Sequence, residues 1–135
     1  VVIGVGTAMT VDYVDERGVF RGGAIVPGPW TMAHALHEFT AKLPLVEPPT
    51  FDPDRTLGRN TREAIEAGIQ AATFGAADTL VWNMSQLSDA KAVLFVTGGG
   101  LDLLRGVGFT ADLAGAVYDP LLTLDGVRLA AEALP

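Results

Sequence analysis

Short runs of apolar residues, many of them β-branched, occupy most of the first 26 positions and predict β-strands. The runs are residues 1–5, 8–14 and 19–26. Gly6-Thr7 separates the first two runs as in a hairpin, and Asp15–Gly18 has turn composition before the third. We therefore expect three neighbouring antiparallel strands in this region.

The period of the pattern then changes from two to about 3.6 residues. Pro29 suits the first turn of a helix that we expect to reach about Leu43. The segment 44–57 contains four prolines and predicts an extended surface loop. Asn60, with Glu63 three residues later, resembles a capping box and predicts a long helix to about Leu87.

Two stripes run along this long helix. The apolar stripe predicts the face that packs on the core; it comprises Ile65, Ile69, Ala72, Ala76, Leu80 and Met84. The second stripe has small side chains that would let another helix approach closely; it comprises Ala64, Gly68, Ala71 and Gly75. The neighbouring helix could belong to the same chain or to a second subunit, and the pattern favours neither.

The last third of the chain predicts one buried strand and two helices. Ala92–Val96 is a continuous apolar run typical of a central strand. Thr97–Gly100 ends it, and Leu101–Arg105 predicts a short helix. We expect a loop over 110–120 and a final helix over Leu121–Leu134. The strand at 92–96 should join the sheet of the first three strands, which gives a single α/β domain over residues 1–135.

Composition narrows the class of protein. Of 135 residues, 49% are hydrophobic and 19% charged, as in a folded globular chain. The net charge of −7 argues against a nucleic-acid partner bound through bulk charge. No cysteine is present, and no apolar run approaches the ~20 residues of a membrane span. We therefore expect a cytoplasmic protein without a membrane partner.

Three stretches have residues suited to binding an anion or a polar ligand. Gly6–Thr10 and Thr97–Gly100 combine glycines, which permit close backbone approach, with amide and hydroxyl donors. An ordinary turn is the competing interpretation of each. Gly58–Thr61 lies at a helix N-terminus and could bind a ligand or serve only as a cap.

Other polar residues carry weaker hypotheses. His34 and His37 could share a metal ion, but no third ligand is near in sequence, so solvated histidines are the favoured interpretation. The acidic residues Asp52, Asp54, Asp15 and Glu16 are expected to face water.

The ordered motifs together resemble the C-terminal half of type III pantothenate kinases, of the acetate and sugar kinase/Hsp70/actin superfamily. The motifs are GTAMTVD, GGAIVPG, TAKLPLVE, GRNTREAIEAG, VTGGG and the closing YDPLLTLDG. The resemblance implies a ribonuclease H-like (actin-like ATPase) half-domain. It implies that Gly6, Thr7, Thr10, Gly98 and Gly99 bind ATP, and that Thr61 contacts pantothenate.

Compared with the family that it resembles, this chain departs from the pattern in two ways. The N-terminal half, with its first phosphate loop and its catalytic aspartate, is expected to be absent, so no catalytic residue is assigned in this chain. Asp78, in Gly75–Asp78, looks superficially similar to the catalytic segment but lies inside the predicted long helix. The second departure is Gly4, which occupies the position of an aspartate that helps to hold a monovalent cation (potassium or ammonium).

These inferences predict an ATP-dependent pantothenate kinase that forms 4′-phosphopantothenate, the first step of coenzyme A biosynthesis, with a divalent metal such as Mg²⁺. The expected partner is a second copy or a chain that supplies the N-terminal half, and the kinase is expected to be inactive without that half. The alternative is a non-catalytic ligand-binding or regulatory relative.

Overall fold

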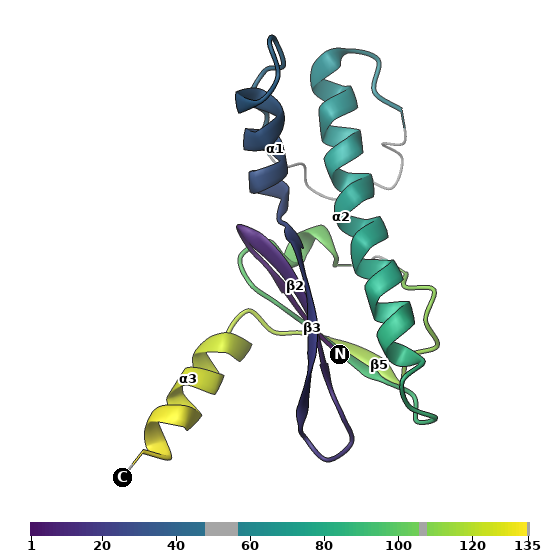
Figure 1. Ribbon diagram of the computed structural model, residues 1–135, viewed down its shortest axis with the longest axis vertical. Coiled ribbons are helices and arrows are strands. Elements are labelled where there is room, and N and C mark those ends of the chain that lie inside the picture. Colours follow the sequence, from purple (N-terminus) through teal and green to yellow (C-terminus); the bar gives the residue numbers. More distant parts are fainter. Residues whose placement is uncertain (48–56, 106–107, 135) are drawn as a thin grey trace.

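The computed structural model describes residues 1–47, 57–105 and 108–134 (Figure 1). The strands are β1 (Val2–Val5), β2 (Ala8–Val14), β3 (Phe20–Pro27), β4 (Val93–Thr97) and β5 (Gly115–Tyr118). The α-helices are α1 (Pro29–Glu38), α2 (Thr61–Ser85) and α3 (Leu122–Glu132), and a 3₁₀ helix spans Leu101–Leu103.

The five strands form one mixed sheet in the order β3-β2-β1-β4-β5. The first three strands pair antiparallel, and β4 and β5 continue the sheet in parallel with β1. The predictions of three antiparallel strands and of a fourth strand at 92–96 in the same sheet are confirmed. The prediction of a loop over 110–120 was wrong in part, because Gly115–Tyr118 pairs with β4 as an edge strand.

One face of the sheet carries the main hydrophobic core under α2. Its strand residues are almost fully buried: Ile3, Val5, Met9, Val11, Leu94 and Val96. Ala77 and Val81 of α2 pack on them, and Leu104 closes the end of the core. A smaller cluster joins α1 to the first half of α2 through Ala33, Val46, Ile65 and Ile69.

The long helix α2 follows its prediction closely at its start. The Asn60 side chain accepts a hydrogen bond from the Glu63 amide at 3.0 Å, and Glu63 accepts one from the Arg59 amide at 2.8 Å. The first bond satisfies a donor that the first turn leaves free. The second comes from the residue before the cap, so the arrangement differs from a regular capping box, in which the cap amide is the donor.

The predicted core stripe of α2 was wrong at Ala72, whereas Ala76, Leu80 and Met84 are partly buried and pack against the main core. The buried residues continue through Thr73, Ala77 and Val81, whereas Ala72 is exposed. The predicted stripe did not include Thr73, which is a polar residue. The Thr73 hydroxyl, however, donates to the Ile69 carbonyl at 2.8 Å, so the helix itself satisfies it in the core.

Two helices are shorter than the pattern predicted. Helix α1 ends at Glu38, before Leu43, and just beyond its end the Thr40 hydroxyl donates to the Leu36 carbonyl at 2.6 Å. The segment after β4 forms a 3₁₀ helix over Leu101–Leu103 and does not extend as a helix to Arg105. The final helix, α3, lies within its predicted range.

The predicted extended loop lies largely outside the described residues, and so do Asp52 and Asp54. No helix among the described residues has the length and apolarity to cross a membrane.

Candidate functional site

Two glycine turns meet at one edge of the sheet. β1 and β4 are parallel neighbours, so their carboxyl ends lie side by side, and Gly6 and Gly98 each follow one of these ends. The Gly100 amide donates to the Val5 carbonyl at 3.0 Å, which ties the second turn to the end of β1. The structure therefore brings together the two segments that the sequence predicted separately.

The backbone of the second turn requires glycine. Gly98 has a φ of +93°, and a Cβ there would lie 2.4 Å from the Val5 carbonyl oxygen. Gly99, by contrast, faces open space, since a Cβ at this position would meet nothing within 4 Å. A side chain is thus excluded on the inner side of this turn, while the outer side is open to a ligand.

The first turn is held from behind by the start of α1. The Gly28 amide and the Thr31 hydroxyl both donate to the Thr7 carbonyl, at 2.9 and 2.6 Å. A Cβ on Gly28 would lie 1.9 Å from the Gly6 carbonyl oxygen, so this contact also needs glycine. The Thr7 side chain remains exposed. Gly28 and Thr31 are positioning residues that sequence reasoning missed, because their contacts cross 21 and 24 residues of chain.

A row of three residues crosses the sheet just below these turns. Gly4 pairs with Thr10 on β2 and with Thr97 on β4, so all three point to the same face. Thr97 is 5% exposed, and its hydroxyl has no hydrogen-bond partner among the described residues. A Cβ on Gly4 would lie 3.1 Å from the Thr10 hydroxyl oxygen. The row therefore offers hydroxyl groups and no carboxylate.

Thr61 lies apart from this edge. It is the first residue of α2 and borders an apolar groove of about 540 Å³ with Leu36, Leu43 and Ile65. Further along α2, Ile69, Gln70 and Thr73 line a small pocket with Pro29 and Leu103. At 1.5 Å per residue, roughly 12–18 Å of helix separates Thr61 from these residues.

The small-residue stripe of α2 is exposed. Gly68 lines the same groove, yet a Cβ on Gly68 or on Gly75 would meet nothing within 4 Å. Within the described residues, then, no other helix makes the close approach that this stripe allows.

The two histidines make contacts of their own. His34 lies near the Trp30 ring, with ring centroids 6.1 Å apart, and His37 donates from Nδ1 to the Leu43 carbonyl at 2.8 Å. The described residues contain no cluster of three His, Cys, Asp or Glu side chains. Asp78, inside α2, accepts a hydrogen bond from the Thr110 amide at 2.7 Å.

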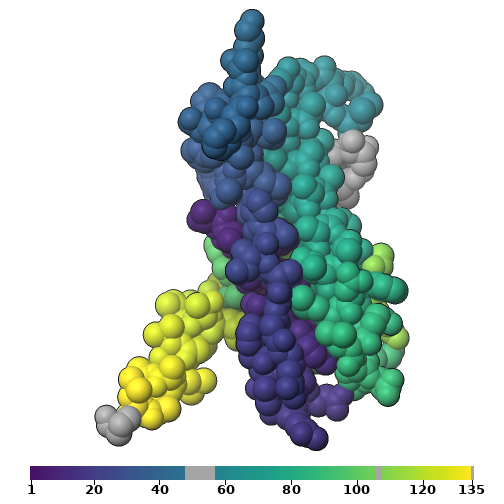
Figure 2. Space-filling view, in the orientation of Figure 1, coloured from purple at the N-terminus to yellow at the C-terminus, as the bar shows by residue number. Residues whose placement is uncertain are grey.

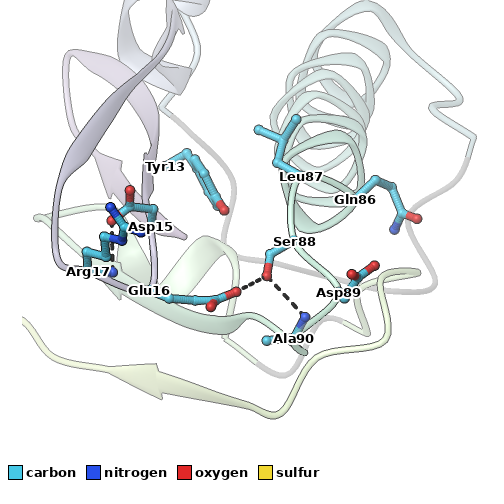
Figure 3. A pocket seen from close by; sticks show the side chains of 9 residues that line it. All are labelled: Tyr13, Asp15, Glu16, Arg17, Gln86, Leu87, Ser88, Asp89 and Ala90. Carbon is cyan, nitrogen blue, oxygen red and sulfur yellow. Dashed lines mark hydrogen bonds between the residues drawn. The ribbon is translucent and has the colours of Figure 1, made fainter.

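A larger pocket of about 690 Å³ lies elsewhere, between the β2–β3 turn and the end of α2 (Figure 3). Glu16 accepts a hydrogen bond there from the Ser88 hydroxyl, as the figure shows. None of the residues expected to bind ATP or pantothenate lines this pocket, so we do not take it as the functional site despite its size.

The expectation that Asp15 faces water was wrong. Its carboxylate accepts hydrogen bonds from the amides of Val19 and Arg17, both at 2.9 Å, and pairs with Arg21 at 2.7 Å. The Val19 amide, followed by Arg21 and Arg17, holds the pKa of Asp15 below its ordinary value, although partial desolvation acts in the opposite direction. Asp15 thus fastens the β2–β3 turn.

The fold defined by this sheet is found in a solved structure. The crystal structure of a conserved Baf family protein from Campylobacter jejuni matches 97% of this chain and 56% of its own, with a TM-score of 0.64 and 21% identity. At that identity the likeness concerns the fold alone.

Sequence comparison then places the chain in a family. The family model for type III pantothenate kinase matches residues 1–83. Relatives with that name are 34% identical in Listeria monocytogenes, 36% in Moorella thermoacetica and 38% in Methylacidiphilum infernorum, over 96–99% of this chain. The chain belongs to the type III pantothenate kinase family. It spans about half the length of these relatives, 48–50%.

Proposed function

We propose that this chain is the C-terminal half of a kinase that transfers a phosphoryl group from ATP to pantothenate and forms 4′-phosphopantothenate. The family match over nearly the whole chain supports this activity, and the meeting of the two glycine turns is the structural observation that carries it. The strand order β3-β2-β1-β4-β5 also supports a ribonuclease H-like half-domain of the actin-like ATPases.

In this proposal the two turns bind the phosphates of ATP. Thr7 presents an exposed hydroxyl from one side, on a turn whose Gly6 amide donates to the Ala8 carbonyl. Gly98 and Gly99 approach from the other without side-chain obstruction on the open side. Thr10 adds a hydroxyl from the neighbouring strand. A divalent metal supplied with ATP would neutralise charge on the phosphates. The role of this chain's residues is to hold the phosphates in place while transfer occurs.

The residues of this chain fit a divalent metal bound with ATP better than they fit the family's monovalent cation. The row Thr10, Gly4 and Thr97 lacks the carboxylate that would supply charge to such a site. We therefore assign no step to that cation.

The base that activates the pantothenate hydroxyl would come from the half of the relatives that this chain does not span. General-base assistance contributes typically about 10²–10⁴-fold to a rate, so we propose that the 135 residues alone are inactive.

We further propose a homodimer that uses the apolar groove between α1 and α2. Met32, Leu36, Leu43 and Ile69 line this groove, and the exposed small residues of α2 continue it. Thr61 lies on its rim. Because Thr61 is remote from the glycine turns of its own chain, we expect its contact with pantothenate to be made across the dimer.

The test is reconstitution. The chain is fused to, or mixed with, the half of the Moorella thermoacetica relative that it does not match, and given ATP, Mg²⁺ and pantothenate. Mass spectrometry should detect phosphopantothenate only in the completed protein. Binding of ATP without any product in a folded, completed protein would contradict the proposal.

That outcome would favour a second candidate, a non-catalytic module that binds a nucleotide or a pantothenate-like ligand. Gly4 is the observation behind this alternative, since it removes a charged group from the phosphate region.

A further inference from the structure

The carboxyl end of β5 lies at the same edge of the sheet as the two glycine turns. β5 runs parallel to β4 and pairs Tyr118 with Val96, which is two residues before Gly98. The Asp119 amide donates to the Val96 carbonyl at 2.9 Å, so the backbone stays paired to this point. Tyr118 therefore lies beside the start of the second glycine turn.

The chain after that turn is tightly coiled as far as Arg105. The Leu101 amide donates to the Gly98 carbonyl at 3.2 Å, and the Arg105 amide donates to the Asp102 carbonyl at 3.3 Å. A 3₁₀ helix rises about 2 Å per residue, so roughly 8 Å of chain separates Leu101 from Arg105. Phosphates at the turn and a group bound at Arg105 are thus close enough to belong to one nucleotide.

The guanidinium group of Arg105 is held in place from two sides. Its Cζ lies over the Tyr118 ring, 5.3 Å from the ring centroid, which is within the range of a cation–π contact. Its Nε donates to the Asp102 carboxylate at 2.9 Å. The ring is itself fixed, because the Tyr118 hydroxyl donates to the Leu104 carbonyl at 3.1 Å and the side chain packs against the main core.

One side of this guanidinium group is open to solvent. The Arg105 side chain is 55% exposed, and only one side of the group is turned toward the Tyr118 ring. Guanidinium groups are planar and stack on aromatic rings, and proteins use them as surfaces on which nucleic-acid bases stack. A side chain that is already held in place loses less conformational entropy when a ligand binds to it.

We propose that the base of the nucleotide stacks on Arg105 while its phosphates bind the two glycine turns, with Asp102 as a positioning residue. This inference rests on the proposed function. A base fits the open side better than a phosphate does, because Asp102 already occupies the Nε donor and offsets the positive charge. What remains accessible is the planar surface, and stacking on a planar surface suits any purine nucleoside di- or triphosphate.

Binding of ADP and of inorganic pyrophosphate separates the base from the phosphates. Both are titrated by calorimetry, with Mg²⁺, into the protein completed with the unmatched half of the Moorella thermoacetica relative. Arg105→Ala should raise Kd for ADP about tenfold, the usual scale of one stacking contact, and leave Kd for pyrophosphate unchanged. Arg105→Lys keeps the charge without the planar group, so Kd for ADP should rise by a similar factor.

Arg128 offers a matched control. It pairs with Asp125, three residues earlier, as Arg105 pairs with Asp102, and the two arginine side chains are 57% and 55% exposed. Arg128 belongs to α3, which stands apart from the body of the molecule (Figures 1 and 2). Arg128→Ala should therefore change neither Kd. All of these arginine variants should melt as the unsubstituted protein does, because both side chains are exposed.

A double-mutant cycle tests Asp102. Asp102→Ala releases the Arg105 Nε and should raise Kd for ADP by a smaller factor than Arg105→Ala. Because Asp102 acts through Arg105, adding Asp102→Ala to Arg105→Ala should raise Kd no further. Additive effects would contradict the positioning role, since Asp102 would then contact the nucleotide itself.

The remaining outcomes decide the proposal. Arg105→Ala that weakens ADP and pyrophosphate equally would overturn it, because the guanidinium group would then contact phosphate. Unchanged ADP binding in a folded Arg105→Ala protein, or full ADP affinity in Arg105→Lys, would overturn it as well. Phosphopantothenate is measured separately by mass spectrometry. ADP binding that depends on Arg105 without any product would overturn the proposed function and leave the base site intact, whereas product with ADP binding independent of Arg105 would overturn the base site alone.

Discussion

The Gly100 amide donates to the Val5 carbonyl at 3.0 Å, and this bond joins the turn after β4 to the end of β1. It fixes the spacing of the two glycine turns that form the candidate phosphate site. Gly98 makes the approach possible, since its φ of +93° and its contact with the Val5 carbonyl leave no room for a side chain.

Substitutions at Gly98 and Gly99 should therefore distinguish a glycine that the backbone requires from one that faces solvent. Gly98→Ala should lower the free energy of unfolding by at least about 1–3 kcal/mol, the usual cost of a strained backbone conformation. Gly99→Ala is the matched control, because a Cβ there meets nothing and its φ is not positive. Urea unfolding of the two variants measures the difference. Equal destabilisation would show that the turn is not held as described.

Local chemistry explains which parts of this fold could be predicted from the sequence. The Gly6-Thr7 hairpin and the Asn60 cap depend on residues a few positions apart, and both predictions are confirmed. The edge strand β5 depends on pairing with β4, about 20 residues away, and a four-residue segment shows little intrinsic pattern.

The candidate site, too, could be predicted from the sequence only in part. The sequence made Gly6, Thr7, Gly98 and Gly99 candidates through their residue types. Only the parallel register of β1 and β4 shows that the two turns adjoin. The unpartnered Thr97 hydroxyl and the contact of Thr31 with Thr7 arise from tertiary packing, which no local pattern contains.

The Asp15 carboxylate should make the β2–β3 turn sensitive to acid. Its pKa is lowered in the folded chain, so the stabilisation is present above the ordinary aspartate pKa and is lost as the pH falls through the folded value. Asp15→Asn should reduce stability at neutral pH and flatten its decline below about pH 4. Thermal melts from neutral to acidic pH check this. Asp112→Asn, at a more exposed pair with Lys91, serves as control.

The groove between α1 and α2 predicts an effect of Gly68→Leu on association alone. In the isolated chain a Cβ at Gly68 meets nothing, so monomer stability should change little. Across a close subunit contact, overpacking should cost about 1–3 kcal/mol, or roughly tenfold or more in the dimer dissociation constant. Sedimentation of the wild type and of Gly68→Leu gives the comparison, with Gly126→Leu as the control at another open glycine. A monomeric wild type would rule out the dimer.

The two threonines should affect different substrates in the completed kinase. Thr7→Val removes a hydroxyl proposed to contact charged phosphate, so KM for ATP should rise about tenfold or more. Thr61→Val should raise KM for pantothenate by a smaller factor and leave KM for ATP unchanged. Steady-state kinetics on each substrate separates the effects, with the exposed Thr79→Val as control. An equal change in both Michaelis constants for Thr61→Val would contradict its assignment to pantothenate.

Gly4 gives the sharpest test of the phosphate region, because one substitution adds the charge that the row Thr10, Gly4 and Thr97 lacks. In the completed protein, Gly4→Asp should make phosphopantothenate formation depend on potassium or ammonium, while the wild type responds weakly. The new Cβ lies 3.1 Å from the Thr10 hydroxyl, so the strand must shift slightly and some stability should be lost. Gly4→Asn has the same shape without the charge and should lose stability without gaining cation dependence. Rates measured by mass spectrometry in potassium, ammonium and tetramethylammonium salts distinguish these cases. A wild-type protein stimulated by potassium as strongly as Gly4→Asp would contradict the prediction, because no carboxylate at position 4 would then be required.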